Sequence, residues 1–271
     1  MMGRTHAGLL AAVLTLVVAA PLEARQSWQL ADQEWCEDSR GGGSSERLCE
    51  VRSSTLSATD GVAVNAGANG AVEVEAWDRD EIEVVTRVQA RARSAARAQE
   101  ILDAVDVSWD DGRLEADGPR TGRRESWTVS YRLRVPRSTD LRLRTTNGGI
   151  SVAGVSGDID VRAVNGGVSF AGLSGDVRGR TTNGGLTVEL TDTSWDGAGL
   201  DLETTNGGVR MSVPEQYSAE LELSTRNGRI DLDFPATVQG RMGRSLRTTL
   251  GDGGPTIRAA TTNGSVEVSR R

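Results

Sequence analysis

The chain contains no lysine, and its single histidine, His6, lies within the first 24 residues. All 31 basic residues are therefore arginine. Because the first 24 residues are predicted below to be a signal peptide, we expect the mature chain to have neither histidine nor lysine. This excludes metal sites with histidine ligands and mechanisms that need a histidine base or a lysine Schiff base.

Aromatic residues are also scarce, at 4% of 271 residues, whereas glycine occurs 33 times. The hydrophobic fraction of 37% is too high for a wholly disordered chain, yet the aromatics are too few for an ordinary packed core. The formal net charge is -7. Since phosphate recognition needs a positive surface, we expect no nucleic-acid partner.

Residues 1–24 are typical of a secretory signal peptide. Arg4 precedes an apolar run over residues 9–20, LLAAVLTLVVAA, which Pro21 ends. A run of this length is too short to span a bilayer core of about 30 Å as a helix. We therefore expect cleavage near Ala24, with Ala20 as the alternative position, export to the periplasm or cell surface, and no stable membrane span afterwards. The alternative is that the run remains as a membrane anchor.

The only cysteines, Cys36 and Cys49, flank a polar, glycine-rich loop. An even count in an oxidising compartment predicts a disulfide between them. The alternative, a reactive thiol or a metal pair, is disfavoured because two cysteines without histidine do not complete a tetrahedral site. We expect residues 25–57 to form a disulfide-tied N-terminal segment in which Trp28 and Trp35 pack against the domain.

Residues 58–271 are expected to form one β-repeat domain. Apolar and charged residues alternate over 72–77 and 127–135, which predicts half-buried strands. One short helix is predicted after Ser94, because apolar residues recur at three- and four-residue steps from 95 to 105.

The sequence repeats itself from Asn147 onward. Residues 147–164, NGGISVAGVSGDIDVRAV, and 165–182, NGGVSFAGLSGDVRGRTT, are identical at ten of 18 positions. Such self-similarity indicates a repeat architecture. The Asn-Gly openings of the units are at Asn147, Asn165, Asn183, Asn206, Asn227 and Asn263.

Two short strands and two turns in 18 residues are enough for one coil of a β-solenoid, whose coils stack about 4.8 Å apart. We therefore predict an all-β, single-chain solenoid, right-handed by analogy, with one short N-terminal helix. The six asparagines would lie in line and form a hydrogen-bonded ladder, with a second ladder of threonines outside it. The charged end at residues 266–271 would end the stack. The alternative is an antiparallel meander, because Asn-Gly is also a strong hairpin signal.

These repeats, with Ser-Gly-Asp between the openings, resemble the bacterial "putative adhesin" family, a β-strand-repeat domain of unknown function similar to the heads of autotransporter adhesins. Residues 72–78, VEVEAWD, and the Val135-Pro136 pair before the first repeat share in the resemblance. It covers residue 61 to the C-terminus and implies a β-solenoid, an extracytoplasmic location and no known catalysis. The N-terminal segment and the loops around Trp195 and 235–254 depart from the family pattern.

A thin coil should enclose no large cavity, so a ligand would bind an outer face, a corner or an inserted loop. Trp195, in an inserted loop, is the candidate ligand contact; the alternative is that its ring is tucked against the sheet. We expect no metal, no cofactor and no catalytic residue. A polysaccharide-active enzyme, with Asp158, Asp160 and Asp176 as paired carboxylates, is a weaker alternative.

The function expected from these observations is a non-enzymatic, exported protein that presents a polar surface for adhesion or for interaction with a protein or glycan at the bacterial envelope. The alternative is a periplasmic or cell-surface scaffold or sensor module of an envelope-stress system.

Overall fold

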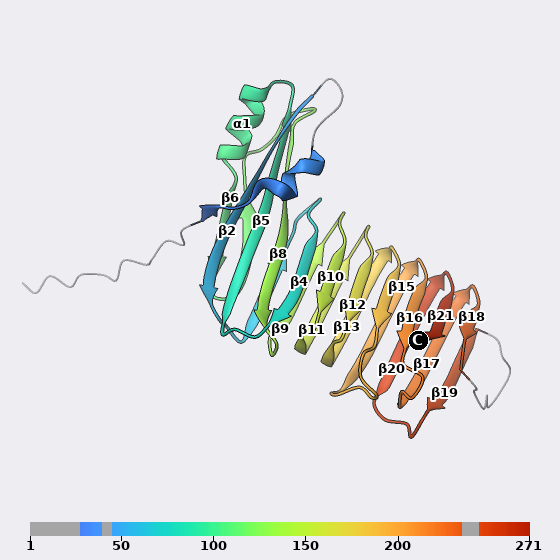
Figure 1. Ribbon diagram of the computed structural model, residues 1–271. Coiled ribbons are helices and arrows are strands. Elements are labelled where there is room, and N and C mark those ends of the chain that lie inside the picture. Colours follow the sequence, from blue (N-terminus) through green and yellow to red (C-terminus); the bar gives the residue numbers. More distant parts are fainter. Residues whose placement is uncertain (1–27, 40–44, 235–243) are drawn as a thin grey trace, which may run out of the picture.

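The computed structural model describes residues 28–39, 45–234 and 244–271, so the predicted signal peptide lies outside the described residues. The described chain forms a rod of two long β-sheets with one α-helix at its N-terminal end (Figure 1). The strands of the first sheet, in spatial order, are β1 (Gln29–Leu30), β2 (Glu46–Ser57), β5 (Glu81–Ala92), β8 (Ser126–Pro136), β4 (Val72–Trp77), β10 (Ile150–Ala153), β12 (Val168–Ala171), β14 (Leu186–Glu189), β16 (Val209–Val213), β21 (Val266–Arg270) and β18 (Ile230–Leu232).

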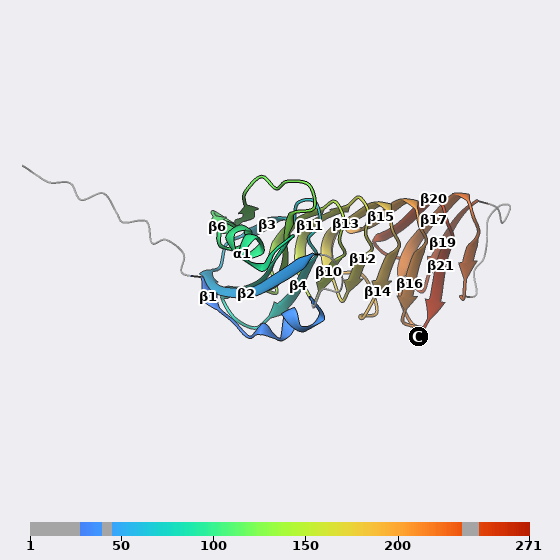
Figure 2. The ribbon, with the colours of Figure 1, turned by 90° about the horizontal axis from the view of Figure 1, so that it is seen from above.

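The strands of the second sheet, in spatial order, are β19 (Ser245–Leu250), β17 (Ala219–Asn227), β20 (Thr256–Asn263), β15 (Gly199–Asn206), β13 (Ser174–Asn183), β11 (Ser156–Ala163), β9 (Asp140–Thr145), β3 (Gly61–Asn65), β7 (Arg113–Asp117) and β6 (Asp106–Asp110). The helices are the 3-10 helix η1 (Gln33–Ser39) and the α-helix α1 (Ala95–Asp103). The hydrophobic core lies between the two sheets, which Figure 2 shows as two layers.

Each repeat coil contributes one strand to each sheet, and matching strands pair in parallel and in register. In the first sheet, Ile150 lies beside Val168, and Val168 lies beside Leu186. These side chains are almost fully buried, as the alternating pattern predicts. The β-solenoid is therefore confirmed. The meander is wrong for the repeats, because their Asn-Gly corners lead from one sheet to the other.

Long antiparallel strands extend the first sheet beyond the repeats. β2 pairs with β5 along its whole length, and β5 pairs with β8. The second half of the predicted N-terminal segment is thus an integral strand of the sheet, and its boundary at residue 57 coincides with the end of β2.

The α-helix covers the N-terminal end of the core. It packs on β2 and β5 and buries Ala98, Ile101 and Leu102. Ser94 is its N-cap, as predicted, and its Oγ accepts a hydrogen bond from the backbone N–H of Arg97 at 3.3 Å. This satisfies one of the backbone donors that a helix start leaves without an intrahelical partner.

The C-terminal coil lies inside the stack. β20 is flanked by β15 and β17, and β21 is flanked by β16 and β18. The predicted stop at residues 266–271 is therefore wrong, and the far end is formed by β18 and by β19, which pairs antiparallel with β17. The spacing of the repeats could not reveal this order, because every coil has an equivalent Asn-Gly corner that can pair with that of any other coil.

The corner asparagines form the predicted ladder. At each step along the stack, Nδ2 of one asparagine donates to Oδ1 of the preceding one at 2.7–2.8 Å. The ladder also begins one coil earlier than predicted, since Nδ2 of Asn147 donates to Oδ1 of Asn69 at 3.1 Å. The order along the stack is Asn69, Asn147, Asn165, Asn183, Asn206, Asn263 and Asn227.

A column of threonine hydroxyls lies inside the corner, so the predicted outer threonine ladder is wrong. Each of these hydroxyls donates to a glycine carbonyl of the neighbouring coil at 2.6–2.9 Å. Burial favours this arrangement, because the interior carbonyl would otherwise lose its hydrogen bonds to water. The members, each two residues before a ladder asparagine, are Thr145, Thr181, Thr204, Thr225 and Thr261.

Candidate functional site

The 3-10 helix η1 lies outside the first sheet, opposite the core (Figure 2). Its residue Trp35 packs on arginines from two neighbouring strands. The guanidinium carbons of Arg132 and Arg87 are 4.1 and 4.9 Å from the ring centroid. Cation–π contacts of this kind contribute about 0.5–2 kcal/mol. The Trp35 side chain is half-buried, so part of the indole faces solvent.

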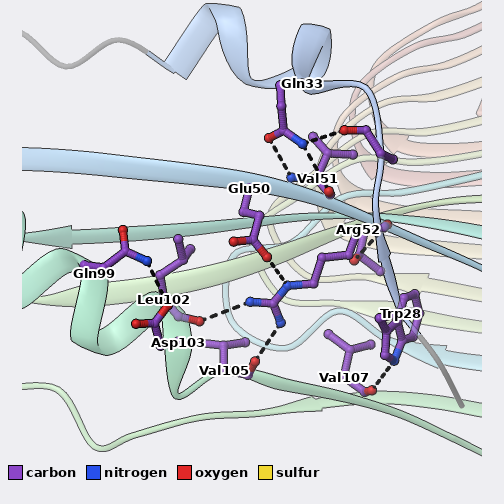
Figure 3. Close-up of polar contacts among 12 residues, drawn as sticks. Trp28, Gln33, Glu50, Val51, Arg52, Gln99, Leu102, Asp103, Val105 and Val107 are labelled. Atoms are coloured by element: carbon purple, nitrogen blue, oxygen red, sulfur yellow. Dashed lines mark hydrogen bonds and ion pairs between the residues drawn. The ribbon is translucent and has the colours of Figure 1, made fainter.

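Two links join η1 to β2. Gln33 makes a pair of hydrogen bonds with the backbone of Val51 in β2, as Figure 3 shows: its Nε2 donates to the carbonyl oxygen at 3.2 Å, and its Oε1 accepts from the N–H at 3.1 Å. The predicted disulfide between Cys36 and Cys49 is confirmed and joins η1 covalently to the same strand. Because these links lie one and two residues from Trp35, the indole is positioned in advance of any partner.

The strand that carries these links is itself fixed to the α-helix. On the other face of β2, the Arg52 guanidinium donates to the carbonyl oxygens of Val105 at 2.9 Å and Leu102 at 3.3 Å (Figure 3). Its Nε forms an ion pair with Glu50. A positive group at the C-terminal end of a helix also interacts favourably with the helix dipole. β2 is therefore a fixed platform for η1.

A hollow of about 410 Å³ separates η1 from the sheet. Its walls carry both signs of charge, because Arg132 pairs with Glu73 at 2.9 Å and Arg134 pairs with Glu83 at 3.3 Å. Val51 adds an apolar part to the lining. Three further carboxylates line it, those of Asp32, Glu34 and Glu75, so acidic side chains outnumber the arginines and the hollow disfavours an anion.

A shallow groove of about 600 Å³ leads from Trp35 across the first repeat coils. Small side chains leave its floor accessible, and the hydroxyl groups both donate and accept hydrogen bonds. An extended polar ligand could therefore lie across the coils with an apolar part against the indole. The glycine and hydroxyl residues at matching positions of three coils are Gly149, Ser151, Gly167, Ser169, Gly185 and Thr187.

The two N-terminal tryptophans have different surroundings. Trp28 anchors the chain as predicted, and its Nε1 donates to the carbonyl oxygen of Val107 at 2.7 Å (Figure 3). Trp35 also packs, but it borders both the hollow and the groove, which the sequence reasoning missed. The sequence did contain a signal for this surface position, because Trp35 lies in a polar segment directly before Cys36, whose disulfide fixes the segment in place.

Trp195 is not an exposed ligand contact. Its side chain is only 5% exposed, and its Nε1 donates to the carbonyl oxygen of Gly175 at 2.9 Å. The ring is part of the hydrophobic core. The candidate contact is therefore withdrawn in favour of the packing alternative.

The carboxylates considered for catalysis pair with arginines. Asp158 and Asp176 lie side by side on β11 and β13, and Arg178 contacts both, with 3.6 Å between its Nη1 and Asp158 Oδ1. Asp160 pairs with Arg162 at 3.0 Å. This is the ion pairing expected between neighbouring positions on a strand surface.

The part of the chain that the structure describes holds no group of three or more histidine, cysteine, aspartate or glutamate side chains arranged to bind a metal ion. Both cysteines are bonded to each other. Within the same ranges, no helix has the length and apolar character needed to cross a membrane.

Comparison with solved structures finds several bacterial proteins that are similar to this chain. A "putative cell adhesion protein" from Clostridium sporogenes shares 7% identity and a TM-score of 0.43, over 83% of this chain and 100% of that one. A "putative adhesin" from Bacteroides fragilis shares 10% identity and a TM-score of 0.31, over 82% and 97%. Another from Parabacteroides distasonis shares 9% identity and a TM-score of 0.34, over 80% and 96%.

None of the curated proteins matches the chain. The family model described as "Toastrack DUF4097" matches residues 102–269, which is more than half of the chain and extends from the end of α1 to the last strand. The chain therefore belongs to the Toastrack DUF4097 family.

Proposed function

We propose that the protein is exported and acts without catalysis, presenting a polar surface for adhesion or for interaction with a protein or glycan at the bacterial envelope. The observation that carries this proposal is the position of Trp35, a half-buried ring next to the Cys36–Cys49 disulfide and at the end of a groove whose lining includes glycine, serine and threonine residues of three coils. Aromatic residues in preformed hollows supply much of the binding energy in many interfaces.

Two further features support the proposal. Disulfides persist in oxidising compartments, which favours an exported location. The carboxylates on neighbouring coils, Asp158 and Asp176, share the arginine Arg178 on an open strand surface. A pair of carboxylates held in this way favours a structural role over glycoside hydrolysis, which needs two carboxyl groups free to act on opposite sides of the scissile bond.

The test is a binding array of glycans and envelope or extracellular proteins, probed with the exported chain and two variants. Trp35→Ala should weaken binding to the recognised member at least tenfold, because a central aromatic anchor is lost. Trp77→Ala is the matched control, since Trp77 also stacks with an arginine, Arg79 at 4.8 Å, but lies outside the groove. Equal binding by the Trp35→Ala variant and the parent would refute the proposal, as would the absence of binding to every member of the array.

A further inference from the structure

A separate pocket of about 370 Å³ opens between the two sheets at their N-terminal end. It is lined by the turn between β3 and β4, by β7 and by the first half of β8. No charged residue lines it, although 25% of the chain is charged. The volume is within the range of small-molecule sites. An uncharged lining disfavours an ionic ligand, because a buried charge without a partner is costly.

One wall of this pocket is the indole of Trp127, which is held rigidly. Its Nε1 donates to the carbonyl oxygen of Pro119 at 3.0 Å. Gly118 lies directly against the ring, so closely that a Cβ at this position would be 2.6 Å from Cε2 of the indole. The ring is therefore a fixed apolar wall.

One residue that lines the pocket carries a buried hydroxyl without a partner. Tyr131 is 1% exposed and lies between this pocket and the groove beside Trp35, and its hydroxyl oxygen forms no hydrogen bond with any described residue. Leaving a buried hydroxyl unsatisfied costs about 1–3 kcal/mol. Burial also raises the pKa of Tyr131, so the hydroxyl keeps its proton and remains both a donor and an acceptor.

The rim supplies further donors from the start of the asparagine ladder. Oδ1 of Asn69 accepts from Asn147, and Oδ1 of Asn65 accepts from the backbone N–H of Gly67, each at 3.1 Å. Neither amide nitrogen, Nδ2 of Asn69 or Nδ2 of Asn65, donates to a described residue. Both residues are exposed at the pocket rim, where these nitrogens can donate to a ligand.

We propose that this pocket binds one neutral sugar ring. A pyranose has an apolar C–H face that suits the fixed indole of Trp127, and hydroxyl groups that match the Tyr131 hydroxyl and the rim amides. The ring can be a free monosaccharide or the end of a glycan, since both present the same chemistry. The inference goes beyond the proposed function, because the groove beside Trp35 can engage a partner while this pocket is empty.

The test is calorimetric titration of the exported chain with glucose, galactose, mannose and N-acetylglucosamine, and with glucuronate as a charged comparison. At least one neutral sugar should bind and glucuronate should not. An oligosaccharide ending in the recognised sugar should bind more tightly than the free sugar if the ligand is a glycan end, and no more tightly if it is a monosaccharide. No heat of binding with any neutral sugar, or preference for glucuronate, overturns the proposal.

Single-site variants localise the binding. Tyr131→Phe should weaken it about five- to tenfold, the equivalent of one hydrogen bond, without lowering the thermal stability. Asn69→Ala should weaken it to a similar extent. Tyr217→Phe, at the other end of the rod, is the matched control and should leave it unchanged. Sugar binding that neither Tyr131→Phe nor Asn69→Ala affects refutes the site. Trp35→Ala should leave sugar binding at this pocket unchanged, even if it abolishes binding of a partner at the groove.

Discussion

Nδ2 of Asn227 donates to Oδ1 of Asn263 at 2.8 Å, although Asn227 comes 36 residues earlier in the chain. The coil that contains Asn227 therefore lies at the end of the stack, and the last coil of the chain lies between it and the coil that contains Asn206. The C-terminal strands are paired on both sides as a result. The last residues of the chain thus contribute an interior coil, and the free end is left to β18 and β19.

The asparagine ladder should contribute to stability in proportion to the number of bonds that each member makes. Asn183 donates to Asn165 at 2.7 Å and accepts from Asn206 at 2.8 Å, whereas Asn227 has one ladder bond among the described residues. Asn183→Ala should lower the unfolding free energy by about 1–2 kcal/mol, and Asn227→Ala by about half as much. Chemical denaturation measures both, and equal losses would contradict a ladder.

Thr182, the residue before Asn183, provides a control for the effect of substitution at the corner. Thr182 is exposed, and its side chain makes no hydrogen bond within the described ranges of the chain. Thr182→Ala should change the unfolding free energy by no more than about 0.5 kcal/mol. A loss as large as that of Asn183→Ala would point to a general sensitivity of the corner.

One position of the buried threonine column is occupied by an alanine, which has no hydroxyl group. Ala163 lies in register between Thr145 and Thr181, and it is buried. Ala163→Thr should add a hydrogen bond to a glycine carbonyl, as the neighbouring threonines do, and raise the unfolding free energy by about 1 kcal/mol. Thr181→Val, which removes such a hydroxyl at nearly constant shape, should lower it by about 1–2 kcal/mol. A destabilising Ala163→Thr would show that the column is not regular.

Stability should fall at alkaline pH because of two tyrosines. Burial raises the pKa of Tyr131 and of Tyr217 above the usual value of 10, with smaller contributions from Glu115 and Asp192. Below that value both tyrosines are protonated in the folded and unfolded states. Above it the unfolded chain loses protons first, so the unfolding free energy decreases as pH rises.

This alkaline effect is easy to isolate, because the chain has no lysine to titrate in the same range. Unfolding free energies measured between about pH 8 and pH 11 should decline in the parent and stay flatter in the Tyr131→Phe/Tyr217→Phe variant. The same slope in both proteins would contradict the assignment.

The disulfide should hold Trp35 over the sheet. Replacing Cys36 and Cys49 by serine should lower the unfolding free energy by roughly 2–4 kcal/mol and shift the emission of Trp35 to longer wavelength, as η1 loosens. The contribution of this one indole is obtained by adding Trp35→Ala to both backgrounds. Emission that is unchanged without the disulfide would contradict this role, because Gln33 and the arginines would then be sufficient to hold Trp35 over the sheet.

Much of the fold could be predicted from the sequence, because the Asn-Gly opening and the alternation of apolar residues recur in every unit. The 18-residue spacing from Asn147 to Asn165 fixes the register of the coils, and alternation identifies the buried positions. The order of the last two coils could not be predicted. Asn227 and Asn263 offer equivalent corners, and only three-dimensional pairing decides which of them meets Asn206.

The candidate surfaces were harder to foresee, because they depend on distant segments. Trp195 was singled out because it lies in an insertion, yet the chain folds it inward. Trp35 becomes part of a groove only when β2 pairs with β5 and brings η1 over the repeats. The uncharged pocket likewise joins Trp127 to a turn about 60 residues earlier in the chain.

The stacking of matching asparagines, with the last coil inside, is tested most directly by cysteine cross-linking. Neighbouring coils are about 4.8 Å apart, which a disulfide can bridge, whereas coils two steps apart are about twice as distant. Asn206→Cys combined with Asn263→Cys should therefore cross-link under mild oxidation, and Asn206→Cys combined with Asn227→Cys should not. Cross-linking of the second pair and not of the first would contradict the arrangement.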